Sequence, residues 1–244
     1  MTTLIVIPTY NERANLPLLV ARLMEVPEYN LLIVDDNSPD GTGPLADRLA
    51  VENERRIKVV HRAEKLGLGS AYVEGFRVAL GEAHEFVVQM DADFSHDPDD
   101  VPRLIAAARK ADVSIGSRYV KGGGADNWPW LRWFVSRGGS LYTQIILGLE
   151  IKDTTSGFKC FRREALARLD LTHVRAKGFG FQVEMNWRCH RARMRLVEVP
   201  IRFVDRKLGQ SKMSRQIFLE AMVLVWTLRA ERSSRTASSE IPAS

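Results

Sequence analysis

The chain contains 244 residues, of which 45% are hydrophobic and 27% are charged, and its formal net charge is +5. These values are ordinary for a soluble globular protein, and no segment reaches the ~18 unbroken apolar residues that a membrane span requires. Two cysteines, Cys160 and Cys189, argue against a disulfide framework or a cysteine-based metal site. They predict a reducing, intracellular compartment.

Short apolar segments alternate with helical patterns through the first half of the chain. The opening stretch MTTLIVIPTY is interpreted as a first strand, because it lacks the basic region and the cleavage site of a signal peptide. The alternation predicts βαβ units, and therefore an α/β fold with a mostly parallel central sheet flanked by helices. Strands are expected at residues 4–7, 31–34, 57–60, 86–88 and 113–115, and helices at 16–24, 45–54, 69–80 and 99–110.

The second half of the chain no longer follows this alternation of short apolar segments and helical patterns. Three glycines open a loop at 122–124, and aromatic residues then gather around Arg132 and Arg137. The serine-rich segment 231–244 is expected to be a disordered tail, which leaves residues 1–230 as a single domain. Further elements are expected as a helix at 131–147, a strand at 157–161, a helix at 181–189 and a strand at 196–203.

An acidic stretch, QMDADFSHDPDD at residues 89–100, follows the fourth apolar segment. A calcium-binding EF-hand loop is excluded, because the positions that require glycine and glutamate hold His96 and Pro102. A polar turn that starts the next helix would account for Asp97 and Pro98. It does not account for the acidic residues before them.

Asp91 and Asp93 form a D-x-D pair that could bind one hard divalent cation. In an extended segment alternate residues project to the same side, so the two carboxylates are expected to converge. Polar residues also end the first two strands, in PTYNE at 8–12 and in VDDNSPDGT at 34–42. Because ligands bind beyond the carboxyl ends of the strands in open α/β sheets, these groups predict one binding site at that edge.

Further motifs follow in a fixed order: KLGLGSAY (65–72), MDADFSHDP (90–98), GSRY (116–119), Arg132 with Ser136 and Arg137, DTTSGFK (153–159), KGFGFQVEM (177–185) and Arg206 to Lys212. Together with the first two strand ends, this set resembles family 2 glycosyltransferases of the GT-A fold. More narrowly, it is similar to polyprenyl-phosphate (dolichyl-phosphate) mannose synthases. The resemblance covers roughly residues 4–212, and in order and spacing the set is specific.

The resemblance implies an inverting, metal-dependent transfer of mannose from GDP-mannose to a polyprenyl phosphate, which gives a β-linked product. The implied cofactor is Mg²⁺ or Mn²⁺, held by Asp93 and Ser95. Asp91, Asp93 and Arg118 would be catalytic. The acceptor phosphate would be met by Arg118, Arg132, Ser136 and Arg137. The donor would be met by Pro8, Tyr10, Glu12, Val34, Asp36, Asp91, Ala92, Asp93, Arg206 and Lys212.

The implied chemistry assigns different tasks to the charged residues. A phosphate monoester is already anionic at neutral pH, so it needs positioning by arginines more than it needs a general base. The segment from Arg206 to Lys212 contains a glycine and is expected to close over the donor as a lid. Supporting roles are expected for His96 and Glu184, and Asp153 is expected to lie behind the site or on its acceptor side.

The acceptor's prenyl tail lies in a bilayer, so the enzyme is expected to be peripheral on the cytoplasmic face of the membrane. Trp128, Trp130, Trp133 and Phe134 beside arginines resemble an interfacial patch, unless half of them belong to the core. Residues 213–228 are a second possible contact, with lipid or with a membrane-protein partner. Nucleic acid is not expected as a partner, because the acidic edge would repel its phosphates.

Two alternative functions stay open at this point. One is a polyprenyl-phosphate glucose synthase that uses UDP-glucose, because the choice of base and sugar depends on the shape of the pocket. The other is a catalytically silent nucleotide-binding module. The intact Asp91 and Asp93 pair, together with Arg206 and Lys212, argues against that second alternative.

Overall fold

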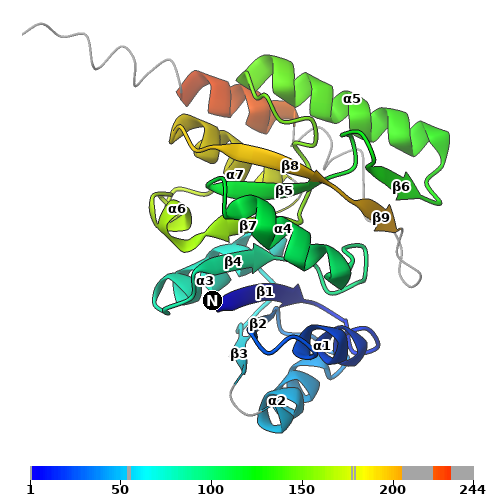
Figure 1. Cartoon of the computed structure of the whole chain (residues 1–244), viewed down its shortest axis with the longest axis vertical. Helices are drawn as coiled ribbons and strands as arrows, with labels where there is room; N and C mark the ends of the chain where they lie inside the picture. The colour runs from blue at the N-terminus through cyan, green and yellow to red at the C-terminus, as the bar shows by residue number, and fades with distance from the viewer. Residues whose placement is uncertain (1, 54–55, 177, 179, 205–221, 232–244) are drawn as a thin grey trace, which may run out of the picture.

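The computed structural model describes residues 2–53, 56–176, 178, 180–204 and 222–231, which form a sheet between layers of helices (Figure 1). The central sheet has seven strands in the order β3-β2-β1-β4-β7-β5-β8. Its pairs are parallel except those of β7, which runs antiparallel to β4 and β5. The strands are β1 (Thr3–Thr9), β2 (Tyr29–Asp35), β3 (Ile57–His61), β4 (Phe86–Gln89), β5 (Val113–Ser117), β7 (Lys159–Arg162) and β8 (Leu196–Pro200).

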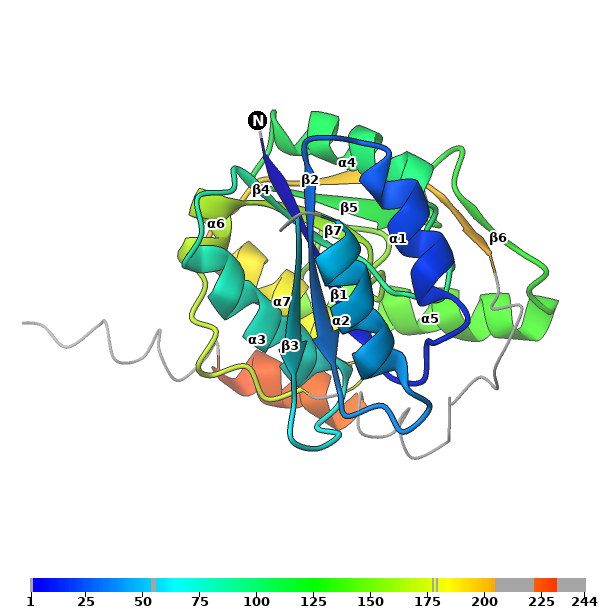
Figure 2. The same cartoon turned by 90° about the horizontal axis from the view of Figure 1, so that it is seen from below.

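Helices cover both faces of this sheet (Figure 2). Leu4 and Val6 of β1 join one hydrophobic cluster, whereas Ile5 and Ile7 join the cluster on the opposite face. This is the two-residue period of a strand, and full burial of each aliphatic side chain contributes roughly 1.5–3 kcal/mol. The helices are α1 (Leu16–Met24), α2 (Thr42–Glu52), α3 (Leu68–Leu80), α4 (Val101–Ala108), α5 (Trp130–Leu147), α6 (Arg163–Ala167) and α7 (Gly180–Arg191).

Helix α3 packs unusually close to the first strand. A Cβ atom added to Gly75 would lie only 2.3 Å from Cγ1 of Val6, which is closer than two carbon atoms can approach. The absence of a side chain at this position therefore allows α3 to lie against β1. The same close packing sets the distance between the sheet and Tyr72, which lies one turn earlier in α3.

The polar strand ends share one edge of the sheet, as the sequence predicted. Thr9 of β1 pairs with Asp35 of β2, and both are the last residues of their parallel strands. Because β7 runs in the opposite direction, it begins at this edge, and its first residue, Lys159, pairs with Gln89 at the end of β4. The segment that leads into β7 therefore reaches the same edge as the ends of β1, β2 and β4.

The structure refines several expected boundaries. The helix expected at 99–110 is preceded by a separate 3-10 turn, η1 (Pro98–Asp100), since Asp97 caps that turn by accepting a hydrogen bond from the Asp99 amide. The strand expected at 196–203 divides, because β8 pairs with β5 whereas β9 (Arg202–Val204) pairs with β6 (Gly124–Asp126) in a separate sheet. Helix α6 was not predicted.

Residues 222–231 form a helix beside α5, and Figures 1 and 2 agree on this placement. Its Val225 and Leu228 are buried in the same cluster that Tyr142 and Ile146 of α5 contact. Glu231, expected to begin a disordered tail, is instead helical, and its carboxylate lies 3.2 Å from the Arg175 guanidinium. The rest of the expected tail, 232–244, lies outside the described residues. Within the described part of the chain, no helix is both long and apolar enough to cross a membrane.

Candidate active site

Two aspartates, Asp35 and Asp36, lie at the end of β2, at the polar edge of the sheet. Asp35 accepts hydrogen bonds from the Thr9 hydroxyl (3.0 Å) and from the Ser38 hydroxyl (2.6 Å), which ties β1 to β2. Asp36 is buried and forms an ion pair with Arg62 at 2.8 Å. It also accepts hydrogen bonds from the Leu66 and Gly67 amides (3.1 and 2.9 Å). Asp36 therefore holds the loop before α3 in place.

Four other residues predicted to meet the donor, Pro8, Tyr10, Glu12 and Val34, lie in β1 or β2 or in the loop that directly follows β1. Pro8 and Val34 are paired neighbours in β1 and β2. The Lys65 ammonium lies 3.5 Å from the centroid of the Tyr10 ring, a cation–π distance. The Glu12 carboxylate accepts a hydrogen bond from the Asn15 side chain at 2.8 Å. The motif KLGLGSAY contained Lys65, yet only its position over Tyr10 marks it as a candidate donor contact.

The D-x-D pair does not lie in an extended segment, and this expectation was wrong. Strand β4 ends at Gln89, and Phe94 has a positive φ of 60°, so the chain turns through these residues. Asp91 accepts a hydrogen bond from the Tyr72 hydroxyl at 2.7 Å, whereas Asp93 accepts one from the Ser95 amide at 3.0 Å. The carboxylates are thus oriented by this turn, with Asp93 and Ser95 both buried.

His96 supports this turn, as the sequence predicted. Its Nδ1 accepts a hydrogen bond from the Asp91 amide at 3.1 Å, which requires the neutral ring to carry its proton on Nε2. The ring is stacked on Phe158 with centroids 4.7 Å apart. Burial lowers the pKa of His96 despite the attraction of Asp91 and Asp93. A buried neutral imidazole that accepts a backbone hydrogen bond and stacks on a neighbouring ring is a structural support.

Arg118, which follows β5, forms a two-point ion pair with Asp153. Its Nε and one terminal nitrogen donate to the two Asp153 oxygens at 2.7 and 2.6 Å, and its amide donates to Oδ2 at 3.0 Å. Burial opposes both charges, yet the Asp153 carboxylate raises the pKa of Arg118, and Arg118 holds the pKa of Asp153 below its ordinary value. Both groups are therefore charged in the folded protein.

Aromatic rings surround the other faces of this arginine. The guanidinium carbon of Arg118 lies 5.2 Å from the Tyr119 ring centroid and 5.3 Å from those of Trp128 and Phe203. Such rings favour a cation over their faces. Trp128, expected in an interfacial patch, instead belongs to this cage.

The three arginines predicted to meet the acceptor phosphate converge on two of these rings. Arg132 lies 4.3 Å from the Trp128 centroid, and Arg137 lies 5.0 Å from the Tyr119 centroid. The Tyr119 hydroxyl donates to Ser136 Oγ at 2.6 Å. The structure thus brings Arg118, Arg132, Ser136 and Arg137 together, and it adds Tyr119 and Trp128, for which sequence reasoning gave no such role. Arg206 and Lys212, predicted to meet the donor, lie outside the described residues.

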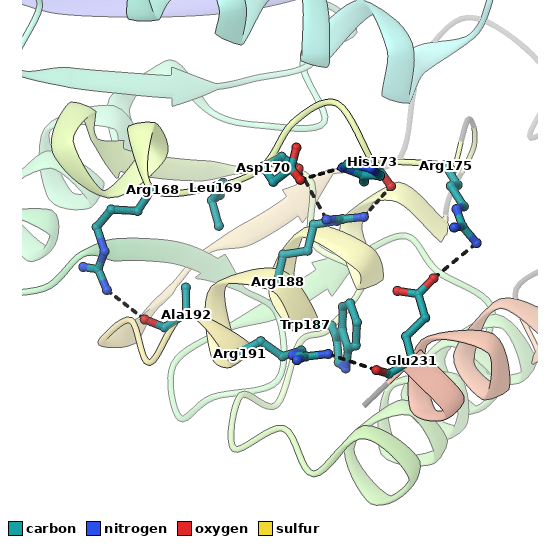
Figure 3. A pocket seen from close by; sticks show the side chains of 10 residues that line it. All are labelled: Arg168, Leu169, Asp170, His173, Arg175, Trp187, Arg188, Arg191, Ala192 and Glu231. Carbon is teal, nitrogen blue, oxygen red and sulfur yellow. Dashed lines mark hydrogen bonds and ion pairs between the residues drawn. The ribbon is translucent and has the colours of Figure 1, made fainter. Parts of the chain in front are cut away.

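A separate pocket of about 410 Å³ lies between the end of α7 and the 222–231 helix (Figure 3). Its arginines are engaged by protein groups: Arg188 by the buried Glu184 (2.6 Å) and Arg175 by Glu231 (3.2 Å). Glu184 also accepts hydrogen bonds from the Arg175 and Ala176 amides, which matches the supporting role expected for it. This pocket shares no residue with the polar edge of the sheet.

The mixed sheet, the acidic turn after β4 and the polar groups at one edge of the sheet match the architecture of GT-A glycosyltransferases. Residues 4–170 match the family model described as Glycosyl transferase family 2. The chain belongs to this family.

Two relatives match nearly the whole chain. It is 48% identical over 231 residues to the polyprenol monophosphomannose synthase of Mycolicibacterium smegmatis, covering 93% of this chain and 87% of that protein. It is 50% identical over 233 residues to the undecaprenyl-phosphate mannosyltransferase of Micrococcus luteus, covering 94% of this chain and 96% of that protein.

Solved structures share the fold at lower identity. The glucosyl-3-phosphoglycerate synthase of Mycobacterium tuberculosis, in complex with Mn²⁺, UDP-glucose and phosphoglyceric acid, aligns with a TM-score of 0.62 and 17% identity over 94% of this chain and 80% of that chain. A mannosyltransferase of Pyrobaculum calidifontis, in complex with GDP-mannose and Mn²⁺, aligns with a TM-score of 0.56 and 16% identity over 96% of this chain and 64% of that chain.

Proposed function

We propose that this protein transfers mannose from GDP-mannose to a polyprenyl phosphate, with inversion at the anomeric carbon. The observation that carries this proposal is the convergence of Arg118, Arg132 and Arg137 on Tyr119 and Trp128, beside the end of β5. Arginine suits planar, two-point recognition of phosphate oxygens. The two relatives at 48% and 50% identity are both named for mannose or mannosyl transfer to a polyprenyl lipid, and they support mannose and a polyprenyl phosphate as the transferred sugar and the acceptor.

The acidic turn fits a divalent cation, Mg²⁺ or Mn²⁺. Asp93 and Ser95 supply hard oxygen ligands from one buried turn. Mg²⁺ and similar ions commonly bind through one or two carboxylates, with substrate phosphates completing the shell. Among the described residues no group of three or more His, Cys, Asp or Glu side chains is placed to hold an ion, so the donor's diphosphate would complete this one. When bound, the ion would stabilise the negative charge of the departing GDP.

On the donor side, the residues of the chain position the nucleotide sugar. Pro8, Val34 and the Tyr10 ring would form the wall around the base and ribose, with Lys65 near by. Asp91, oriented by Tyr72, would accept hydrogen bonds from the sugar or ribose hydroxyls. Arg206 and Lys212 would meet the diphosphate from the segment expected to close over it.

On the acceptor side, the reaction needs arginines that position the phosphate and does not need a general base. The acceptor phosphate oxygen already carries the negative charge that attacks the anomeric carbon, so no proton has to be removed. Arg132, Arg137 and Ser136 would hold the other phosphate oxygens, while Arg118 is fixed by Asp153. The attacking oxygen would approach opposite the leaving diphosphate, which turns an α-linked donor into a β-linked product.

An apolar face beside these arginines suits the surface of a membrane. Helix α5 contains two charged residues, Arg132 and Arg137, and both contact rings of the site. Its outward side is apolar, with Phe134 60% and Ile145 70% exposed. Trp226 of the neighbouring 222–231 helix is 56% exposed as well. These exposed side chains support a peripheral position at the membrane surface, which we propose to be its cytoplasmic face, with or without a membrane-protein partner.

The test is transfer of radiolabelled mannose to a polyprenyl phosphate in the presence of Mg²⁺ or Mn²⁺. Asp93→Ala is expected to abolish transfer. Asp99→Ala removes an aspartate from the same stretch, but this side chain is 79% exposed and pairs with Arg22, so transfer should continue. Equal loss in both variants would point to damage of the loop, and full activity of Asp93→Ala would overturn the assigned metal site.

A further inference from the structure

Lys159, the first residue of β7, is fully buried at the polar edge of the sheet. Its ammonium donates to the Ser156 carbonyl at 2.5 Å and to the side-chain oxygen of Gln182 in α7. In the antiparallel register its neighbour is Gln89, the last residue of β4. The sequence placed Lys159 within the motif DTTSGFK but assigned it no function.

A buried ammonium is unfavourable unless its environment compensates for lost water. Burial lowers the pKa of Lys159 to about 7, although Asp153 and Asp91 act in the opposite direction. Cys189 and Arg118 are the other titratable groups that face it. An apolar side chain of similar length would fill this position with less desolvation, so stability alone does not account for a lysine here.

The hydrogen bond to Ser156 fixes a turn that touches the donor side of the site. A Cβ atom added to Gly157 would lie 3.3 Å from Gln182 Nε2, 3.4 Å from His96 Cε1 and 3.6 Å from Asp91 Oδ2. The Gly157 backbone therefore lies close to both α7 and the acidic turn, with space for little more than a methyl group between them. Lys159 links this turn to α7, because its ammonium binds both the Ser156 carbonyl and the Gln182 side chain.

The other end of the same segment holds the acceptor side. Asp153 and Thr155 both bind the Arg118 guanidinium (2.6–2.7 Å). Between them, the Thr154 carbonyl accepts a hydrogen bond from Asn186 at 2.8 Å. Asn186 lies one turn after Gln182 in α7, and both side chains are buried. Residues 153–157 thus run from Arg118 to Asp91, and α7 holds them directly through Asn186 and indirectly, by way of Lys159, through Gln182.

We propose that Lys159 is a positioning residue, which holds residues 153–157 so that Asp91 and Arg118 stay at the separation that the transfer reaction requires. The residue touches neither substrate and acts through Ser156, Gly157 and Gln182. The inference rests on the proposed function for the identity of donor and acceptor.

The test compares the wild type with Lys159→Met and with the double variant Lys159→Met/Gln182→Met, which also removes the polar partner in α7. Ile115→Val, opposite Lys159 in β5, is the control for small packing changes. In both lysine variants kcat should fall about 10- to 100-fold, because a displacement of about 1 Å can cost that much. The KM for GDP-mannose should stay within about threefold of the wild-type value, since the donor's own contacts remain.

A second readout is independent of turnover. Amide hydrogen exchange of the 153–158 segment should be faster in both lysine variants than in the wild type and Ile115→Val, while the melting temperature of at least the double variant is maintained. Unchanged exchange in this segment, or kcat within twofold of the wild type, would overturn the inference. So would a loss of activity that only follows a loss of folded protein. A wild-type enzyme that fails to transfer mannose would instead contradict the proposed function. The two failures can be told apart, because the exchange experiment needs no substrate.

Discussion

Arg118 and Asp153 form a buried two-point ion pair between residues that are 35 positions apart in the chain. The pair joins the end of β5 to the segment that precedes β7. Glu198 of β8 completes the connection, because its carboxylate accepts hydrogen bonds from the Lys152 and Asp153 amides at 2.8 and 2.9 Å. The acceptor side of the site is therefore built on three adjacent strands, and its geometry should depend on this pair.

Asp153→Asn should lower the free energy of unfolding by roughly 3–5 kcal/mol, because it leaves the Arg118 charge buried without its partner. Urea denaturation of the two proteins measures the difference. The matched control is Asp126→Asn, whose partner Arg202 is 64% exposed, so the cost there should be about 1 kcal/mol or less. A similar decrease in the free energy of unfolding in the two variants would show that burial does not increase the contribution of the Arg118 pair to stability.

Tyr72→Phe should reduce kcat, because Asp91 loses the hydroxyl that orients its carboxylate at 2.7 Å. The expected cost in stability is only about 1 kcal/mol, that of one hydrogen bond. Tyr142→Phe is the control, because the buried Tyr142 hydroxyl has no hydrogen-bond partner among the described residues. Steady-state kinetics and thermal melts of both variants check this. Equal kinetics for the two would mean that Asp91 does not need Tyr72.

The stability of the wild type relative to Lys159→Met should rise with pH above about 7. The ordinary pKa of lysine is 10.5 and that of Lys159 in the folded protein is about 7. Between these values the unfolded chain binds the extra proton, so raising the pH favours the folded wild type. Urea denaturation of both proteins at pH 7.0 and 8.5 gives the comparison, in which other titrating groups cancel. A difference that is independent of pH would contradict the lowered pKa.

Phe134→Ser combined with Ile145→Ser should weaken binding to phospholipid vesicles by at least about tenfold. Each apolar side chain withdrawn from water contributes roughly 1.5–3 kcal/mol, and 1.4 kcal/mol corresponds to a factor of ten. Val51→Ser is the control, since this side chain is 84% exposed and its helix, α2, lies at the opposite end of the molecule from α5 (Figure 1). Vesicle co-sedimentation measures all three proteins, and unchanged binding of the double variant would exclude this face of α5.

Most of the sheet could be predicted from the sequence, because strands buried on both faces are continuous apolar runs such as residues 4–7. The position of the site followed from the same pattern, since parallel strands bring their polar ends to one edge. Partners far apart in sequence could not be predicted: nothing in GSRY indicates that Arg118 binds Asp153. The orientation of Asp91 was also missed, because it depends on Phe94 turning the chain and on Tyr72 approaching from α3. Lys159 read as an ordinary strand residue until its burial was known.

The most direct measurement of the central claim is the choice of donor by the purified protein. GDP-[¹⁴C]mannose and UDP-[¹⁴C]glucose would each be incubated with the protein, Mg²⁺ and a polyprenyl phosphate, and the label in the organic phase counted. The account predicts labelled mannosyl lipid, dependent on the metal and on Asp93, and no labelled glucosyl lipid. Glucose transfer, or no transfer from GDP-mannose while metal-dependent nucleotide binding persists, would contradict it.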